Sequence, residues 1–350
     1  MRFEKDDLIS DIPIFLLSIL SSINVPPLKS IPKFKPLKKI KNILNIKIVN
    51  DNKLEKCDWW FVLHGSGLVE RENCLCDPDH VVYVSMEPSE KISQATDKFL
   101  QQFSHLVICD RNVKHRNIIY SNWLTWWIGM IVTTKNKKHV FQPDVRLNYD
   151  QLSSMQPEKK INKISIILSD KDFSEGHKKR IEFIKKITNL PISKYIDVYG
   201  HGFNPVPDKW DVIAPYKYHL VLENSCTKDY WSEKLADTFL GFSLPIYHGC
   251  PNIYDYFSKD SLSIININNI EESVKVLNDI INSNIYDNRM KEIAISRNKV
   301  LNQYNIFNLM SELAINNSLK HQNITLNTNM FFKDSFLKKI TRFILSKFIH

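Results

Sequence analysis

The alternation of short apolar runs with helical patterns constrains this chain more than any other feature of its sequence. Three apolar runs, Asp58–Leu63, His80–Val84 and His105–Cys109, occur in the first part of the chain. Between the last two lies Glu87–Gln102, a polar segment with apolar residues at helical spacing. Continuous short apolar runs are typical of parallel strands that are covered on both faces of their sheet. The first part therefore predicts an α/β unit built on a parallel sheet.

The same alternation restarts after residues 150–163, which are polar and unpatterned and which we interpret as a linker. We expect strands at Ile164–Leu168, Ile196–Tyr199, Tyr218–Glu223, Leu244–Tyr247 and Ser263–Ile267, and helices at Lys178–Ile187, Tyr230–Leu240, Glu271–Asn282 and Asn288–Leu313. Two such halves predict two Rossmann-like, doubly wound domains that face a cleft, with ligands at the carboxyl ends of the strands. The predicted division is residues 1–155, residues 156–315 and a tail of residues 316–350.

Composition excludes several classes of protein. The 350 residues are 43% hydrophobic, which excludes a disordered chain, and only 8 glycines exclude collagen-like repeats. The apolar run Ile12–Val25 is too short for a spanning helix, so we expect a buried helix or strand there. Six scattered cysteines and the lack of a signal-peptide pattern favour reduced thiols and a cytoplasmic protein.

Two basic stretches flank the predicted domains. Residues 29–47 contain seven lysines and no acidic residue, and the tail Phe331–His350 places aromatic and basic side chains on opposite helical faces. Such a tail fits peripheral contact with the anionic inner face of a membrane, or a docked terminal helix with a solvated basic side. The net charge of +9 is mild, and these lysines belong to no recognised motif, so we expect no nucleic-acid partner.

Familiar catalytic motifs are missing from the sequence. It contains no G-x-G-x-x-G, P-loop, G-x-S-x-G, H-E-x-x-H or C-x-x-C pattern. Asp77-Pro78-Asp79 has the Asp-x-Asp form that holds a divalent metal in many sugar-nucleotide enzymes, but a turn explains it more simply. One further set of residues has the types but not the spacing of a zinc site: Cys57, Cys74, Cys76 and His80. We therefore expect no metal.

The segment Tyr216–Gly249 is the most informative part of the sequence. A strand ends in the polar residues Glu223-Asn224-Ser225, and a helix capped by Asp229 or Ser232 follows. Its first turn would present free N–H groups and contains Lys234, although cations usually avoid the positive end of a helix. Lysine, N–H groups and helix dipole together predict an anion pocket suited to a diphosphate, with Glu233 placed to accept hydrogen bonds from sugar hydroxyls. A surface ion pair between Glu233 and Lys234 is the alternative.

This segment resembles the signature of the glycosyltransferase family 10 fucosyltransferases, the α-1,3/α-1,4 enzymes. The matching residues are Tyr216-Lys217-Tyr218, Glu223-Asn224-Ser225, Asp229-Tyr230, Glu233-Lys234, Pro245 and Gly249. Weaker similarity extends over about residues 55–310 and includes Ser85-Met86-Glu87-Pro88, Ser169 with Arg180, and Val198-Tyr199-Gly200.

The resemblance implies a GT-B enzyme that moves fucose from GDP-fucose with inversion and requires no cofactor or metal. Its N-terminal domain would hold the acceptor, a GlcNAc-type residue of a surface glycan such as lipopolysaccharide, and its C-terminal domain the donor. Glu87 is similar to the family's general base. The residues implied for donor binding are Glu223, Asn224, Ser225, Tyr230, Glu233, Lys234 and Arg180. The family's basic residue after the glycine turn is replaced by His201-Gly202-Phe203-Asn204, which leaves Arg180 or Lys209 as the substitute cation.

Two other functions remain compatible with the sequence. One is a nucleotide-sugar transferase with another donor, or a metal-dependent one that uses Asp77 and Asp79. The other is a non-catalytic glycan- or membrane-binding relative, which the basic tail and the missing arginine would suit. Retention of Glu87 together with Glu233-Lys234 favours an active enzyme over this second alternative.

Overall fold

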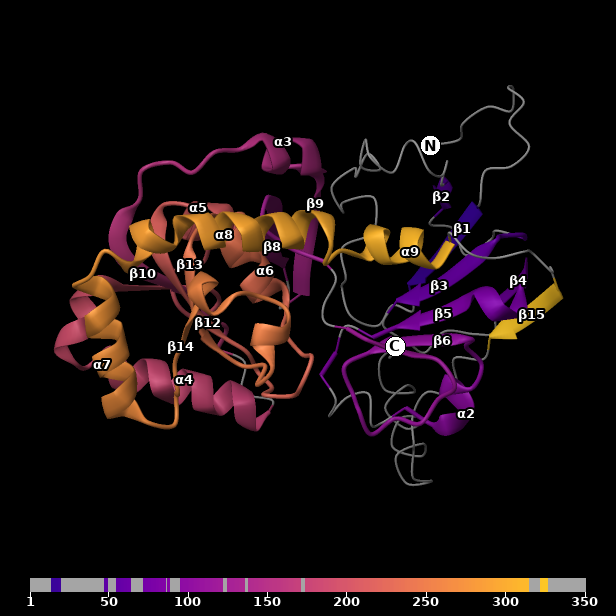
Figure 1. Ribbon diagram of the computed structural model, residues 1–350, viewed down its shortest axis with the longest axis horizontal. Helices are drawn as coiled ribbons and strands as arrows, with labels where there is room; N and C mark the ends of the chain where they lie inside the picture. The colour runs from indigo at the N-terminus through magenta and orange to yellow at the C-terminus, as the bar shows by residue number, and fades with distance from the viewer. Residues whose placement is uncertain are drawn as a thin grey trace. The chain divides into compact units, whose positions relative to one another are not determined.

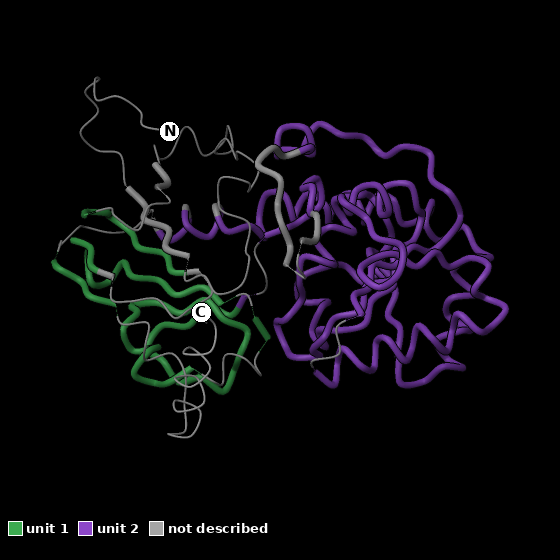
Figure 2. Tube along the Cα trace, turned by 180° about the vertical axis from the view of Figure 1, so that it is seen from behind, with its two compact units in different colours: residues 1–23, 47–120, 318–350 green, residues 24–46, 121–317 purple. Residues whose placement is uncertain are grey.

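The protein is described by a computed structural model (Figure 1). The described residues are 14–19, 47–49, 55–63, 72–85, 87–88, 95–121, 125–135, 138–170, 174–314 and 322–326. They divide into two compact units (Figure 2). The first unit comprises the described residues up to 120, together with 322–326, and the second comprises those from 121 to 314.

The first unit is built on a parallel sheet of six strands in the order β2-β1-β3-β5-β6-β7. These strands are β1 (Ile14–Ile19), β2 (Lys47–Val49), β3 (Trp59–Leu63), β5 (Val81–Val84), β6 (His105–Ile108) and β7 (Ile118–Tyr120). Every residue of β5 is buried, as expected of a central strand that is covered on both faces. The predicted runs at residues 58–63, 80–84 and 105–109 are thus strands, and the run Ile12–Val25 contains a strand rather than a helix.

Three further elements complete the first unit. A second, antiparallel pair joins β4 (Glu72–Cys76) to β15 (Gln322–Leu326). The 3-10 helix η2 (Pro78–His80) precedes β5, and the helix α2 (Asp97–Leu100) precedes β6. The helix predicted over residues 87–102 is shorter in the structure, because Thr96 is the N-cap of α2 and the described residues 87–88 and 95–96 are not helical. Residues 89–94 lie outside the described part of the chain.

The second unit contains a parallel sheet of five strands in the order β11-β10-β12-β13-β14. They are β10 (Ile161–Ile167), β11 (Ile196–Tyr199), β12 (Tyr216–Leu222), β13 (Leu244–His248) and β14 (Ser263–Ile264). The chain runs outward from β10 to β11 and then crosses back to β12, so the strand order reverses beside β10. In open α/β sheets such a reversal is where ligands bind.

Helices cover both faces of this sheet (Figure 1). They are α4 (Glu175–Ile187), α5 (Trp210–Ile213), α6 (Glu233–Leu240), α7 (Ile270–Ile281) and α8 (Ile285–Asn302), with the 3-10 helices η3 (Pro191–Tyr195), η4 (Ile253–Asp255) and η5 (Lys259–Ser261). A further helix of this unit, α9 (Ile306–Ala314), follows α8 in the chain. α4 and α7 contact each other, whereas α6 packs on β12, β13 and α8. One large apolar core lies between the helices and the sheet. The predicted α/β class with two parallel-sheet units is confirmed.

The structure corrects the predicted linker and helix boundaries. Residues 150–163 are no linker, because α3 (Tyr149–Ser154) and the start of β10 lie within them. Asn148 and Gln151 cap each other's backbone at the start of α3, a local device that polarity alone did not reveal. The single helix predicted over 288–313 is two helices, α8 and α9.

The boundary between the units also differs from the predicted position at residue 155. The second unit already begins at residue 121 and includes the hairpin of β8 (Met130–Lys135) and β9 (Lys138–Val145). Trp126, Ile128 and Leu147 are buried in its core. Packing of these apolar side chains, rather than a change in composition, decides which unit the segment joins.

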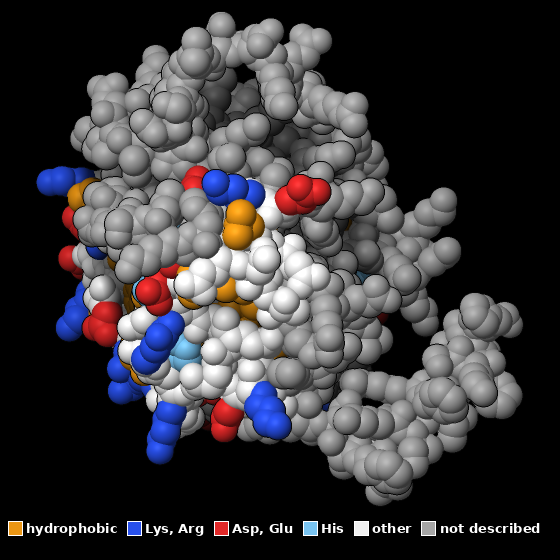
Figure 3. Space-filling model, turned by 90° about the vertical axis from the view of Figure 1, so that its right-hand side faces the viewer, with side chains coloured by type: hydrophobic (Ala, Val, Ile, Leu, Met, Phe, Trp, Pro, Cys, Tyr) orange, Lys and Arg blue, Asp and Glu red, His pale blue; other side chains and the backbone are white. Residues whose placement is uncertain are grey.

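The predicted basic segments lie largely outside the described residues, as do Phe331–His350 in full. The part of the predicted tail that is described, β15, is a strand of the first unit. Within the described part of the chain, no helix has the length and hydropathy needed to cross a membrane. On the face in Figure 3, basic and acidic side chains of the described residues lie interspersed.

Candidate functional site

The loop between β12 and α6 is fixed by buried polar contacts. Glu223, at the end of β12, is 2% exposed and accepts hydrogen bonds from the backbone N (2.8 Å) and Oγ of Ser232. Asp229 adopts a φ of 64° and accepts hydrogen bonds from Asn252 Nδ2 (2.8 Å) and Tyr256 Oη (2.9 Å). A non-glycine residue with positive φ requires such support from its surroundings. The loop is therefore preorganised.

The start of α6 differs from the predicted open anion site. Ser232 is the N-cap, and its Oγ accepts a hydrogen bond from the backbone N of Lys234 (3.3 Å), while its own N donates to Glu223. Of the two predicted caps, Ser232 is therefore correct and Asp229 is wrong. Because Ser232 and Glu223 already engage these N–H groups, an anion here would depend on side-chain cations more than on the helix start.

Charged side chains of alternating sign follow one another along this region. Lys234 Nζ lies 3.3 Å from Glu233 Oε1 and 3.6 Å from Glu223 Oε2. On its other side, Glu233 Oε1 lies 3.6 Å from Lys209 Nζ, which in turn donates to Asp237 Oδ2 at 2.7 Å. Burial alone would raise the pKa of Glu233, but Lys234 and Lys209 outweigh it and lower that pKa to about 2. Glu233 is thus an anion throughout the physiological range.

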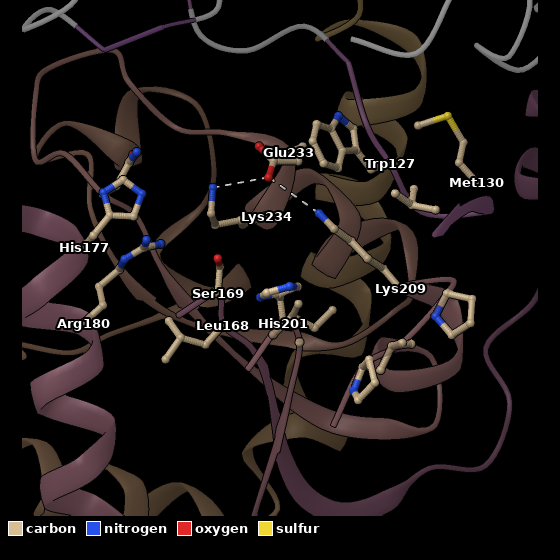
Figure 4. Close-up of a pocket in the computed structure, with 17 residues that line it drawn as sticks. Trp127, Met130, Leu168, Ser169, His177, Arg180, His201, Lys209, Glu233 and Lys234 are labelled. Atoms are coloured by element: carbon tan, nitrogen blue, oxygen red, sulfur yellow. Dashed lines mark hydrogen bonds and ion pairs between the residues drawn. The ribbon is translucent and has the colours of Figure 1, made fainter. Parts of the chain in front are cut away.

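Three of these residues, Lys209, Glu233 and Lys234, border a cavity of about 580 Å³ that is lined by residues of the second unit. In Figure 4, His177 and Arg180 lie on one side of it, Trp127, Met130 and Lys209 on the other, and Glu233 and Lys234 between them. The full lining is Trp127, Met130, Val132, Ile167, Leu168, Ser169, His177, Arg180, Gly200, His201, Pro205, Val206, Pro207, Lys209, Asn224, Glu233 and Lys234. The cavity includes the ends of β10 and β11, at the reversal of strand order.

Arg180 is the most unusual charge in this cavity. The residue is 5% exposed, and its Nη1 donates to the carbonyl of Leu222 at 3.0 Å. Its Nε has no hydrogen-bond partner, and no carboxylate of a described residue lies within 4.0 Å of the guanidinium. Burial lowers the pKa of Arg180, yet an arginine remains protonated at neutral pH. Glu223 and Glu233 act on this cation only from beyond ion-pair distance. Because a buried cation that lacks a direct counterion is costly, the site is electrostatically suited to an anionic ligand.

A close approach of α4 to the β12–α6 loop positions Arg180. Gly176, in the first turn of α4, lies so near the backbone of Asn224 that any Cβ there would overlap it. Glycine at this position lets His177 and Arg180 reach the same cavity as Asn224.

Of the predicted donor-binding residues, Arg180, Asn224, Glu233 and Lys234 line the cavity. The other three support the loop. Glu223 holds Ser232, Tyr230 Oη donates to Asn224 Oδ1 at 3.2 Å, and Ser225 Oγ lies 2.8 Å from Thr227 Oγ1. Lys209, a candidate substitute cation, also lines the cavity but is already bound to carboxylates.

Among the lining residues that were not predicted to belong to the site are Trp127, His177 and His201. Trp127 belongs to a stretch without secondary-structure pattern, and His177 precedes the predicted start of its helix. His201 Nδ1 lies 2.7 Å from Asp170 Oδ1, a contact between two loops. The positive φ of Gly200 (114°) and Gly202 (85°) shapes the turn around His201, and the Gly-x-Gly spacing was the one available signal.

Glu87, the predicted general base, follows β5 in the first unit and is half-buried. Its backbone N donates to Ser85 Oγ at 3.3 Å, and its carbonyl accepts a weak hydrogen bond from Cys109 Sγ. Glu87 is therefore at the carboxyl end of a parallel strand, the expected place for a functional side chain in such a sheet. Its catalytic role stays a prediction.

The metal alternatives gain no support from the described residues. Asp77 Oδ1 caps η2 by accepting the N–H of Asp79 at 2.9 Å, and Asp79 pairs with Arg116 at 3.4 Å. Cys57 Sγ and Cys74 Sγ lie 3.4 Å apart. Among the residues that the structure describes, no group of histidine, cysteine and carboxylate side chains has a metal-binding arrangement.

Comparison with known proteins finds similarity to one family of glycosyltransferases. Residues 157–290 match the family model of glycosyltransferase family 10 (fucosyltransferase), C-terminal part. A fucosyltransferase-like protein of Arabidopsis thaliana is 28% identical over 124 residues, 35% of this chain and 24% of that protein. An α-(1,3)-fucosyltransferase of Helicobacter pylori is 30% identical over 74 residues, 21% of this chain and 15% of that enzyme. The chain thus matches a quarter or less of the length of these curated relatives.

A crystal structure of an α1,3-fucosyltransferase with GDP-fucose aligns with a TM-score of 0.45 and 13% identity, over 86% of this chain and 96% of the other. The second unit, which contains the five-stranded parallel sheet and the cation-lined cavity, also contains the residues that match this glycosyltransferase model. The similarity to glycosyltransferase family 10 thus extends over residues 157–290.

Proposed function

We propose that this protein transfers fucose from GDP-fucose to a hydroxyl of a GlcNAc-type residue in a surface glycan, with inversion at the anomeric carbon and without a metal. The match of residues 157–290 to a fucosyltransferase family model supports fucose as the transferred sugar. The fucosyltransferase names of the two relatives support the same chemistry.

The buried guanidinium of Arg180, which forms no ion pair with a described carboxylate and whose Nε has no hydrogen-bond partner, is the observation that carries the proposal. A nucleoside diphosphate would supply the anion that this buried cation lacks, and bidentate contact between a guanidinium and a phosphate is favourable. Lys234 borders the same cavity and could exchange part of its contact with Glu233 for a phosphate oxygen. We therefore assign Arg180, rather than Lys209, as the substitute for the missing basic residue.

In the proposed reaction, the acceptor hydroxyl attacks the anomeric carbon while the bond from that carbon to the β-phosphate oxygen breaks. The departing GDP takes the electron pair, and Arg180 and Lys234 stabilise the developing negative charge. Glu87 takes the hydroxyl proton. Because the nucleophile enters opposite the leaving group, through a transition state of oxocarbenium character, the configuration inverts.

The decisive experiment incubates purified protein with labelled GDP-fucose, GDP-mannose and UDP-GlcNAc and a GlcNAc-containing acceptor, with and without EDTA. We expect fucosyl transfer that survives EDTA, and thermal stabilisation by GDP but not by UDP. Transfer from another donor alone, or activity that EDTA removes, would contradict the proposal.

Glu87→Gln tests the general base separately. Loss of general-base assistance lowers transfer by about 10²–10⁴-fold. The affinity for GDP should stay unchanged, because the cavity is formed by residues of the second unit. Undiminished transfer by Glu87→Gln would remove Glu87 from the mechanism.

A further inference from the structure

Two buried carboxylates hold three consecutive backbone N–H groups of the segment that opens the second unit. Trp127 N and Ile128 N donate to Asp237 Oδ1 at 2.8 and 2.9 Å. Gly129 N donates to Asp208 Oδ1 at 3.0 Å. Asp237 is 0% exposed and Asp208 1% exposed. These contacts join positions about a hundred residues apart in the chain, so they define where the segment lies on the second unit.

The second oxygen of Asp237 contacts Lys209, a residue that lines the cavity. Asp237 Oδ2 accepts a hydrogen bond from Lys209 Nζ at 2.7 Å, and Lys209 Nζ lies 5.1 Å from the centre of the Trp127 ring. Lys209 and Trp127 both line the cavity, on the side opposite Arg180 (Figure 4). One buried carboxylate thus holds the backbone of Trp127 and the ammonium group beside its ring, while it does not line the cavity itself.

We propose that Asp237 is a positioning residue for the donor cavity, acting through Lys209 and the backbone of Trp127. Lys209 also lies 3.6 Å from Glu233, so its position bears on the Glu233–Lys234 pair that faces the donor. The role rests on the proposed function, because it assumes that GDP occupies this cavity. A residue that only stabilised the fold would leave donor affinity unchanged.

Asp208 provides a matched control. It is equally buried and binds the same segment, and it also accepts from Trp210 N at 2.9 Å. Its second oxygen, however, lies 3.5 Å from Arg146, a half-exposed residue that does not line the cavity. An asparagine at either position keeps one oxygen for the backbone N–H groups and replaces the other with an NH₂ donor. Only at Asp237 does that NH₂ meet the Lys209 ammonium.

The test measures the Kd for GDP, the donor KM and the thermal unfolding midpoint of the wild type and four variants. These are Asp237→Asn, Asp208→Asn, Lys209→Met and the double variant Asp237→Asn/Lys209→Met. We expect Asp237→Asn and Lys209→Met each to weaken GDP binding at least tenfold, with donor KM rising and acceptor KM unchanged. The double variant should bind GDP no more than about twofold more weakly than either single variant, because the two residues act through one interaction. Asp208→Asn should lower the midpoint but keep the GDP affinity within about twofold.

The double variant also protects the test against misfolding. Asp237→Asn removes the nearer of the two carboxylates that pair with the Lys209 ammonium, whereas the double variant removes both members of that pair, which is less disruptive. If the double variant bound GDP as tightly as the wild type, the positioning role would be overturned. Additive losses, or an equal loss in Asp208→Asn, would overturn it too. A wild type that bound no GDP would overturn the proposed function and this role with it, whereas GDP binding unaffected by Asp237→Asn would overturn this role alone.

Discussion

The two sides of the cavity present cations in opposite electrostatic states. Lys209 lies between the carboxylates of Asp237 and Glu233 at 2.7 and 3.6 Å. Arg180, 5% exposed, has no carboxylate of the described residues within 4.0 Å, and its Nε is without a partner. The charge of Lys209 is balanced by carboxylates without a ligand, whereas Arg180 would gain a direct counterion only when an anion binds.

This difference assigns different roles to the two cations: Arg180 is expected to bind the ligand, and Lys209 to hold the cavity wall in position. Removing one member of a satisfied buried pair leaves the other charge uncompensated, and stability suffers. Removing a buried charge that has no carboxylate within ion-pair distance relieves part of a desolvation cost but abolishes its contact with a ligand. The same substitution should therefore cost more stability at Lys209 and more ligand affinity at Arg180.

Arg180→Met is expected to have the largest effect on binding. It should weaken GDP binding by about 10²–10³-fold, the loss typical of a buried charge contact. The unfolding midpoint of the unliganded protein should fall less than in Lys209→Met, where two carboxylates lose their partner. Calorimetry with GDP and thermal unfolding of both variants measure the comparison. A larger midpoint loss for Arg180→Met would show that Arg180 serves the fold instead.

Lys234→Met should have an intermediate effect. Lys234 already contacts Glu233 and Glu223, so a phosphate gains less from it than from Arg180. We expect GDP binding about 10–10²-fold weaker, with a moderate loss of stability because two carboxylates lose a counterion. Titration with GDP and with inorganic pyrophosphate should give similar fold-losses. A loss confined to GDP would move Lys234 away from the diphosphate.

The smallest expected effect is the pH dependence of stability that Glu233 contributes. Its pKa is lowered from 4.5 to about 2, since the attraction of Lys234 and Lys209 exceeds the opposing effect of burial. A carboxyl with a depressed pKa in the folded state stabilises the protein above pH 4.5 and loses this contribution as the pH falls through about 2. Urea unfolding of the wild type and Glu233→Gln should thus give stability differences that shrink between pH 5 and pH 2. Parallel profiles would mean that the pairing with the two lysines is weak.

Sequence reasoning succeeded where one segment contains its own signal. The apolar strands of the second sheet and the Glu223-Asn224-Ser225 loop could be predicted, because strand, loop and helix follow one another between residues 216 and 249. It failed where distant residues meet. Trp127 and Asp237 are 110 residues apart in the chain, and no local sequence pattern predicts their contact. Glu233 and Asp237 are four residues apart in a helix, so their shared face was the one hint that Asp237 would join the charged network.

The predicted helix start failed for a different reason. Ser232 was predicted as a possible N-cap, but its contact with the buried Glu223 was not predicted. Glu223 had been interpreted only as a residue that contacts the ligand. The same carboxylate that resembles a donor-binding residue thus has a structural task.

The pairing of β15 with β4 has a consequence for folding during translation. Thr325 Oγ1 donates to Asn73 Oδ1 across 252 residues, and all described residues of the second unit are translated between them. During translation, β4 therefore has no β15 partner until residues 121–314 have been synthesised. A chain truncated before residue 322 would lack β15 and leave an edge of β4 open to pairing with other strands. We therefore expect β15 to protect the first unit against aggregation.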